Sequence, residues 1–479
     1  MFMKEPVYIT FANRIAKMIE DGTFKPGDKL PSIRSLHQKK GLSVGTILQS
    51  FNYLLDKGLV ISKEKSGYFV QDVSSQEIPM PKVIPVSLSA KAVHIDSLLQ
   101  KLPLDGTGKK FVSFTNALPD NRLLPFNSIK RFIQQTSRDY SGSYLGLESR
   151  YGNKCLREEI AKRSLHWKGH VHTDEIIITN GAAEAILCCL KAVTQPGDTV
   201  LVQAPCFFGV LQIIECLGLK VVSIPSNPAS GISIEEVKKA CKKLAVKACV
   251  IISNFNNPDG ASISTEGKKE LAELANTLHI PVIEDDLYAE LFFKGGRPDT
   301  IKSYDTDGWV MYCSSFTKIL APGFRVGWCA AGRFAYDVAR IKSILNHSTS
   351  NFNQQVILQL LSSGMLERHL LKFRLEMHKN FNRYAFLIQQ HFPNGTKITQ
   401  PNGGLYIWVE LPVTLNTTSL LPKAIEQGIS YAPGEIFSPK GGYQHYLRIS
   451  YSGLWEKKVE SALIALGKLF SNAVDEFGN

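Results

Sequence analysis

Residues Ser314–Trp328 read SSFTKILAPGFRVGW, and they are the most informative part of the chain for its class of fold. This stretch directly follows the apolar run Trp309–Cys313, which predicts a buried strand. A lysine just past a strand end, Lys318, is well placed to condense with an aldehyde once burial or positive neighbours lower the pKa of its amine. Arg325 is suited to clamp a phosphate. Because an S-x-x-K pattern alone more often marks a surface lysine, the interpretation depends on the rest of the chain.

Polar groups follow two strands upstream of this stretch. Asp285 ends the strand predicted over 281–284, at the position where open α/β sheets bind ligands, although a helix N-cap is an alternative role. A carboxylate there can keep a pyridine nitrogen protonated, which makes the ring an electron sink. Asn257 follows the strand predicted over 249–253, in a segment that also fits a simple turn. Together with Tyr288, it can donate to the O3′ oxygen of a pyridoxal ring.

Three further features extend the pattern toward both ends of the chain. In Glu175–Ala183 a strand runs into a helix through Gly181, and amides at such a helix start can hold a phosphate. Phe207 follows the next strand and can stack on a planar cofactor, although core packing is nearly as common a role. Arg448 lies in the otherwise apolar strand His445–Tyr451. It therefore needs an anionic partner, and a substrate carboxylate is a natural one.

The first seventy residues have a different pattern from the rest. Their apolar periodicity and capping residues predict three helices and a hairpin, over 8–21, 33–40, 43–58, 60–62 and 68–70. This order is typical of a winged helix-turn-helix, whose second paired helix enters a major groove. The segment holds 11 Lys and Arg against 6 Asp and Glu, a balance of +5, which suits a DNA backbone. A helical dimerisation module is the alternative.

The same segment resembles the GntR family of bacterial regulators. The resemblance rests on KPGDKLPSIR at residues 25–34, on GLV at 58–60 and on SGYFV at 66–70. It implies contacts to double-stranded DNA from the helices and the wing, at Ser32, Arg34, Ser43, Thr46, Gln49 and Gly67. Val44 departs from the pattern, because the family often has a basic residue just after the capping serine. We therefore expect an unusual site preference.

From Phe111 to Leu469, the order and spacing of the motifs resemble the class I/II aminotransferases, which are fold-type I pyridoxal-phosphate enzymes. The match includes GGLYIW at residues 403–408. It implies an α/β fold with a mainly parallel sheet, flanking helices and a smaller C-terminal subdomain. It also implies pyridoxal 5′-phosphate as the cofactor, a Schiff base on Lys318 and a substrate carboxylate on Arg448.

The resemblance also assigns a role to each remaining group. Asp285 faces the pyridine nitrogen, and Asn257 and Tyr288 face O3′. Phe207 stacks on the ring. The phosphate is held by Ala182, Ala183, Ser315 and Arg325.

Three positions depart from the aminotransferase pattern. Ala183 offers only its backbone amide where a polar side chain is usual, and Phe207 replaces the usual tyrosine or tryptophan. Leu147 stands where a tyrosine usually reaches the phosphate of the neighbouring subunit, a role that Tyr144 or Tyr151 can take over. We therefore expect a reduced affinity for the phosphate.

Composition sets the remaining limits. The chain has 479 residues and a net charge of +12, so about two to four structural units and anionic partners are expected. We interpret 1–70 as the DNA-binding domain, 71–109 as a proline-containing linker and 110–479 as the aminotransferase-like domain. The nine cysteines form no C-x-x-C pair, which indicates reduced thiols and no metal site. No signal peptide or membrane-spanning run is visible, so we expect a cytoplasmic protein without membrane contact.

A GntR-type reader joined to an aminotransferase-like domain resembles the MocR subfamily of regulators. The resemblance implies a homodimeric transcription regulator that binds a DNA operator and responds to an amino acid or amine through an aldimine. One alternative is a working aminotransferase with an accessory DNA-binding domain, because no catalytic position is visibly lost. Another is a regulator that responds to the cofactor itself.

Overall fold

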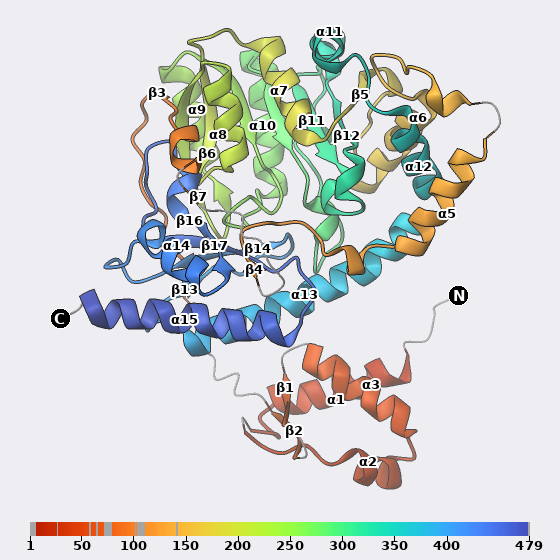
Figure 1. The fold of residues 1–479 in the computed structure, drawn as a ribbon, viewed down its shortest axis with the longest axis vertical. Helices are drawn as coiled ribbons and strands as arrows, with labels where there is room; N and C mark the ends of the chain where they lie inside the picture. The colour runs from red at the N-terminus through yellow and green to blue at the C-terminus, as the bar shows by residue number, and fades with distance from the viewer. Residues whose placement is uncertain are drawn as a thin grey trace.

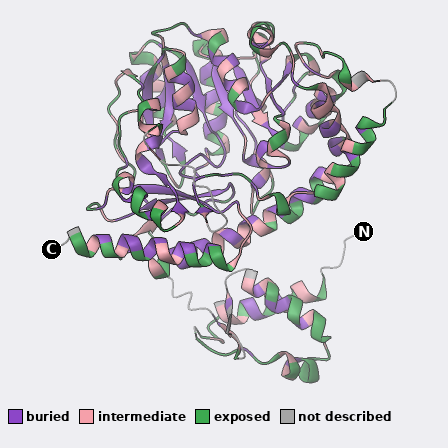
Figure 2. Cartoon of the chain, viewed as in Figure 1, coloured by how far each residue is buried: buried purple, intermediate pink, exposed green. Residues whose placement is uncertain are grey.

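The computed structural model describes residues 6–25, 27–56, 59–63, 66–70, 79–100, 102, 111–139 and 142–477. Figure 1 shows a small N-terminal unit in red, a large α/β body mainly in yellow and green, and a smaller C-terminal layer in blue. Figure 2 shows that buried residues gather on the central strands and on the inner faces of the helices. Within the described parts of the chain, none of the helices combines the length and the apolar character needed to cross a membrane.

The N-terminal unit is a winged helix-turn-helix. It contains α1 (Val7–Glu20), α2 (Ile33–Lys40), α3 (Val44–Asp56) and an antiparallel hairpin of β1 (Val60–Lys63) and β2 (Gly67–Val70). These elements fall close to the predicted ranges, so the predicted type of domain is confirmed.

Capping residues and a small apolar core explain why these short helices form. The Ser32 hydroxyl accepts from the amide of Ser35 at 3.2 Å, and the Ser43 hydroxyl accepts from the amide of Thr46 at 3.0 Å. Both bonds satisfy amides that have no partner within their own helix. The inner faces of the helices share one core, which includes Ala12, Leu36, Ile47, Phe51 and Leu54.

The large body is built on a nine-stranded sheet of order β3-β7-β6-β9-β10-β11-β12-β5, with β8 paired to β7. Neighbours from β7 to β11 run parallel, whereas β3, β8 and β12 run antiparallel to their neighbours. The predicted mainly parallel sheet is therefore confirmed. Its strands are β3 (Lys91–Ala92), β5 (Ile176–Thr179), β6 (Thr199–Ala204), β7 (Lys220–Asn227), β8 (Gly231–Ile232), β9 (Val246–Ile251), β10 (Val282–Asp285), β11 (Val310–Ser315) and β12 (Gly327–Ala330).

Helices cover both faces of this sheet, because successive strand residues point to opposite sides. Val200 and Val202 of β6 belong to the core that also holds residues of α7 (Ala182–Val193), α8 (Phe208–Cys216) and α11 (Ala335–Asn346). Leu201 between them belongs to the opposite core, with residues of α9 (Ile234–Lys243) and α10 (Thr265–Leu278).

The C-terminal layer is a second, antiparallel sheet of order β13-β14-β17-β16. Figure 1 shows α13 and α15 running along its lower edge. This layer is the predicted smaller subdomain. Its elements are β13 (Lys397–Ile398), β14 (Tyr406–Glu410), β16 (Ala432–Pro433), β17 (Tyr446–Ser450), α13 (Met365–His391), α14 (Thr417–Glu426) and α15 (Lys457–Phe477).

The remaining described elements connect these layers. The parallel pair β4 (Val112–Ser113) and β15 (Ile429–Ser430) ties the start of the large body to the C-terminal layer. Three helices, α5 (Phe126–Ser137), α6 (Lys154–Arg163) and α12 (Asn351–Ser362), pack together at the edge of the large body that carries β5.

Residues 79–100 lie against the body of the chain that follows them. Within them, β3 extends the main sheet, and α4 (Asp96–Leu99) follows. The amides of Ile95 and Asp96 both donate to Glu215 Oε2, at 2.7 and 3.0 Å. We expected a linker here, because three prolines and a weak periodicity conceal so short a strand. The domain boundaries at residues 70 and 110 stay a prediction.

Candidate functional site

The site lies at one edge of the main sheet. Because β5, β6, β9, β10 and β11 share one direction, their carboxyl ends meet at the same edge, which is where open α/β sheets bind ligands. Strand β12 runs the opposite way, so Arg325, just before its start, reaches that edge too. Sequence motifs that are far apart along the chain are thereby brought together.

A cavity of about 170 Å³ opens at this edge. Its wall contains every residue that the sequence predicted to hold a cofactor, together with Lys318. The wall also contains residues that we did not predict, namely Ile186, Gly209, Val210, Ile213, Ile252, Leu287 and Thr317. Arg448 is not part of the wall.

Lys318 ends the short 3-10 helix Phe316–Lys318 that follows β11. Its Nζ donates to the carbonyl of Ala117 at 2.9 Å. Burial lowers the pKa of Lys318 to about 8, with further lowering by Arg448 and Arg325 and an opposing effect of Asp285. A substantial fraction of the amine is therefore neutral near physiological pH, as a nucleophilic lysine requires.

Asp285 is the last residue of β10 and is almost fully buried. Its Oδ1 has no hydrogen-bond partner among the described residues. Burial raises the pKa of Asp285 to about 8, and the neighbouring Asp286 raises it further, against an opposing effect of Lys318. A buried carboxylate oxygen without a partner is costly, so this wall of the cavity suits a ligand that carries a protonated nitrogen.

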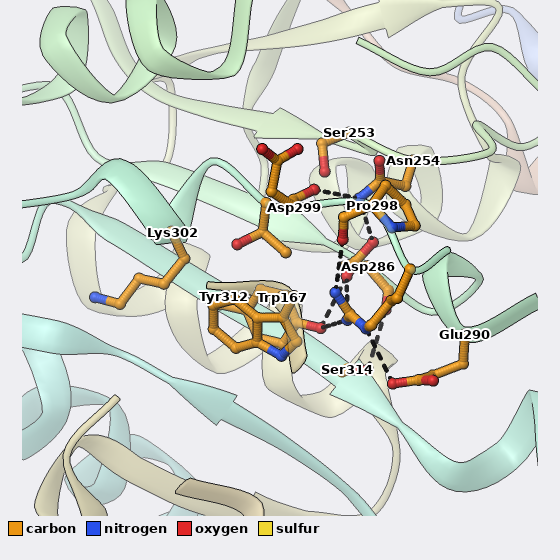
Figure 3. Close-up of polar contacts among 12 residues, drawn as sticks. Trp167, Ser253, Asn254, Asp286, Glu290, Pro298, Asp299, Lys302, Tyr312 and Ser314 are labelled. Carbon is orange, nitrogen blue, oxygen red and sulfur yellow. Dashed lines mark hydrogen bonds and ion pairs between the residues drawn. The ribbon is translucent and has the colours of Figure 1, made fainter. Parts of the chain in front are cut away.

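Asp286, the next residue, has a different environment. Figure 3 shows its polar contacts, and its partners Asn254 and Arg297 line a different pocket from the cavity that holds Asp285. The carboxylate of Asp286 accepts from Arg297 and Tyr312, both at 2.9 Å, and from Asn254 at 3.0 Å. These bonds fix the end of β10 and so hold Asp285 in place. Sequence reasoning missed this network, because its members come from four separate segments that share no motif.

One end of the cavity is a cradle for an anion. Gly181 adopts φ +101°, and a Cβ there would lie 2.5 Å from Nη2 of Arg325. That guanidinium donates to the carbonyl of Asn180 at 2.9 Å. The amide of Asn180 in turn donates to Glu184 at 2.6 Å. Helix α7 begins at Ala182, so its unpaired first amides and a guanidinium converge here, as phosphate binding requires.

Hydroxyl groups complete this end. Ser315 Oγ accepts from the amide of Thr317 at 2.9 Å and donates to its hydroxyl at 2.7 Å. Nη1 of Arg325 lies 3.5 Å from the same Thr317 hydroxyl. Thr317 was not predicted as a site residue, although it directly precedes Lys318 in the sequence.

Phe207 and Tyr288 line the middle of the cavity. The Phe207 ring lies over Gly209, where an added Cβ would come within 2.6 Å of the ring. Burial raises the pKa of Tyr288 to about 12, so its hydroxyl stays protonated and can donate. The ring of Tyr288 packs edge-on against Tyr406, with centroids 5.1 Å apart.

Arg448, on β17, is connected to the cavity through Asn257. Its Nη1 donates to Asn257 Oδ1 at 2.8 Å, and its Nη2 donates to the carbonyl of Thr115. Its Nε has no partner among the described residues. The guanidinium also lies over the rings of Tyr406 and Phe437, 4.9 and 5.1 Å from their centroids. Burial lowers the pKa of Arg448, so the site favours an incoming anion.

The residues at the expected subunit contact lie apart from the cavity wall of their own chain. Leu147 is 77% exposed. Tyr144 donates to the carbonyl of Ser137 at 3.4 Å, and the ring of Tyr151 lies beneath the guanidinium of Arg157. Which of them, if any, contacts a second subunit stays a prediction.

The predicted DNA-contacting residues lie on or next to α2, α3 and the wing of the N-terminal unit. Arg34 and Gln49 are exposed on α2 and α3, and Thr46 is half-buried. Ser32 and Ser43 are exposed but act as helix caps. Gly67, at φ +105°, starts β2 of the wing.

Two family models match the chain. "Bacterial regulatory proteins, gntR family" matches residues 8–70, and "Aminotransferase class I and II" matches residues 115–466. The fold and these matches define a helix-turn-helix regulator fused to a class I/II aminotransferase domain.

Two relatives from Escherichia coli (strain K12) are similar over nearly the whole chain. The uncharacterized HTH-type transcriptional regulator YdcR is 34% identical over 96% of this chain and 98% of its own length. The uncharacterized HTH-type transcriptional regulator YjiR is 32% identical over 98% and 99%. The chain belongs to this family, the MocR-type transcription regulators of the GntR group.

The large body also matches solved enzyme structures. LysN, an α-aminoadipate aminotransferase from Thermus thermophilus, was solved in complex with N-(5′-phosphopyridoxyl)-L-leucine. It superposes with a TM-score of 0.72 at 25% identity, over 77% of this chain and 94% of that chain. The fold of the large body is therefore that of the fold-type I aminotransferases.

The pKa of Lys318 can be tested directly. Competitive acetylation with trace acetic anhydride should show that Lys318 reactivity rises about tenfold per pH unit up to about pH 8 and then levels off, because only the neutral amine reacts. An added lysine peptide should level off near 10.5, the ordinary value. Arg448→Met should move the Lys318 midpoint upward, because it removes a positive neighbour. A Lys318 profile like that of the peptide would contradict the buried environment.

Proposed function

We propose that this regulator binds pyridoxal 5′-phosphate in the cavity of the large body and senses an amino acid or amine there. The single observation that carries the proposal is the convergence on one cavity of Lys318, the unpartnered oxygen of Asp285 and the anion cradle at Gly181. These three features match the aldehyde, the pyridine nitrogen and the phosphate of that cofactor. The ligand named for the LysN structure, a phosphopyridoxyl amino acid, supports the same choice.

The residues present fit this group. Lys318 would hold it covalently, Asp285 would pair with the ring nitrogen, and Phe207 would cover one face of the ring. Asn257 and Tyr288 would donate to O3′. The phosphate would be held by Ala182, Ala183, Ser315, Thr317 and Arg325. When bound, the cofactor supplies an electrophilic carbon that captures primary amines and an electron sink for them.

Arg448 is the residue that would select the effector. Its guanidinium is buried, and its two described partners are an amide oxygen and a carbonyl, neither of which carries a negative charge. An effector carboxylate can take both terminal nitrogens in a bidentate pair. Asn257 and Thr115 would then have to move away from the guanidinium. This movement would link effector binding to the contact between the C-terminal layer and the main body.

The regulatory step follows from that contact. A coupling free energy of about 1–3 kcal/mol between the effector site and the DNA reader suffices for a useful switch. We propose that the protein works in the cytoplasm as a homodimer, because helix-turn-helix readers recognise paired half-sites. Leu145 and Leu147, 79% and 77% exposed, support a subunit contact at this loop.

Replacement of Lys318 tests the proposal that this lysine binds pyridoxal 5′-phosphate. Incubation with pyridoxal 5′-phosphate, followed by borohydride reduction, should leave a cofactor-derived mass on the peptide that contains Lys318. The Lys318→Ala protein should carry no such mass, while Lys220→Ala, at an exposed position on β7, should behave like the parent protein. A reduced adduct spread evenly over other lysines would overturn the assignment.

The DNA side has its own test. Arg34→Ala should weaken specific DNA binding by about 1–3 kcal/mol and lower the salt dependence of binding by about one counterion, because one charged contact is lost. Fluorescence anisotropy over a range of salt concentrations measures both quantities. The matched control is Lys243→Ala, at an exposed position of α9. Equal affinities of Arg34→Ala and the parent protein would show that this family contact is missing here.

A further inference from the structure

The exposed face of α3 has an unusual composition for a helix that reads DNA. Its outward residues are Val44, Gly45, Leu48, Gln49 and Asn52. Val44 is 51% exposed and Leu48 is 41% exposed. They lie one helical turn apart on the same side of the helix, so they form a continuous apolar strip next to two amide side chains.

No charged residue interrupts this face. Between Val44 and Leu55 the sequence contains neither a basic nor an acidic residue. The cations lie beside it instead, and Arg34, Lys39 and Lys40 on α2 are exposed. Exposed Lys29 lies just before α2, beside the wing residue Phe69. The exposed positive charge described here is therefore on α2 and at Lys29, while the exposed face of α3 is neutral.

Base pairs differ in what they offer to such a face. Guanine is most often read by arginine or lysine, through its O6 and N7 atoms. Adenine is read by asparagine or glutamine, and the thymine methyl group is read by apolar contact. The described face of α3 has amide side chains for adenine and apolar side chains for thymine, and it has no arginine or lysine for guanine.

We propose that α3 reads A·T base pairs, with Val44 and Leu48 packed on thymine methyl groups and Gln49 and Asn52 on adenine. The proposal rests on DNA binding by the N-terminal unit and adds the chemistry of the bases that it recognises. It also accounts for Val44 at the position where related readers often have a cation. Affinity comes from the flanking cations, and sequence preference comes from the neutral face.

The first experiment selects sequences from a random duplex library with the full-length protein. The expected result is paired half-sites whose core positions are A·T pairs. One selected duplex is then resynthesised with deoxyuridine in place of each core thymidine, which removes only the methyl group. Each methyl group removed from a contact should weaken binding about 3–5-fold.

Protein variants show which residue contacts each thymine methyl group. Val44→Ala and Leu48→Ala should each reduce the difference in binding affinity between the thymidine duplex and the deoxyuridine duplex at one core position. Leu48→Arg should shift the selected core toward guanine. The matched control is Val7→Ala, because Val7 is a 61% exposed valine on α1, and it should keep the full difference. All the substituted positions are exposed, so unchanged circular dichroism verifies that the variants fold.

The other outcomes are distinct. A G·C core with no effect of deoxyuridine overturns the inference and leaves DNA binding intact. A change in oligomeric state on Val44→Ala or Leu48→Ala, with the thymidine preference unchanged, shows that the strip contacts protein and also overturns it. If the selection enriches no sequence, the N-terminal unit does not bind DNA sequence-specifically, and both this inference and that part of the proposed function are wrong.

Discussion

The alternation of side chains at the end of β10 is the constraint on which the site depends. Successive residues of an extended backbone point to opposite sides, and Asp286 directly follows Asp285, the last residue of β10. The two side chains therefore have different surroundings. Asp286 is saturated by Arg297, Tyr312 and Asn254. Asp285 is left with an unpartnered oxygen at the cavity wall. The bonds to Asp286 hold the strand end, and they thereby keep the carboxyl group of Asp285 at the cavity wall, where a ligand can supply the missing partner.

Two other polar groups, Arg325 in the cavity wall and Arg448 behind Asn257, are held in a similar way. Gly181 permits a backbone that a side chain would block, and Arg325 fills the space so created. Arg448 is buried against uncharged partners rather than against a carboxylate. In each case the fold holds a polar group near a position that a ligand would occupy. A regulator that retains such a site can use ligand binding energy to shift its conformation.

Much of this could be predicted from the sequence, because strands followed by polar residues must end at one sheet edge. That rule, together with the aminotransferase resemblance, predicted one site for Lys318, Asp285 and Asn257. The winged helix-turn-helix was predicted from caps and apolar periodicity. The contacts of Thr115 with Arg448, and of Arg297 with Asp286, could not be predicted, since they join segments far apart in the chain. Strand β3 is too short to show a period, and prolines before it suggested a linker.

We propose that ligand binding in the cavity of the large body controls DNA binding. The most direct measurement is the affinity of the cofactor-loaded protein for a selected duplex, titrated with a panel of amino acids and amines while absorbance is recorded. We expect one compound both to shift the absorbance to a persistent species and to change the affinity about 5–150-fold, and we expect Lys318→Ala to abolish both effects. Repeated turnover of an amino acid with a keto acid, with DNA affinity unchanged by every compound, would contradict this proposal and identify a working aminotransferase.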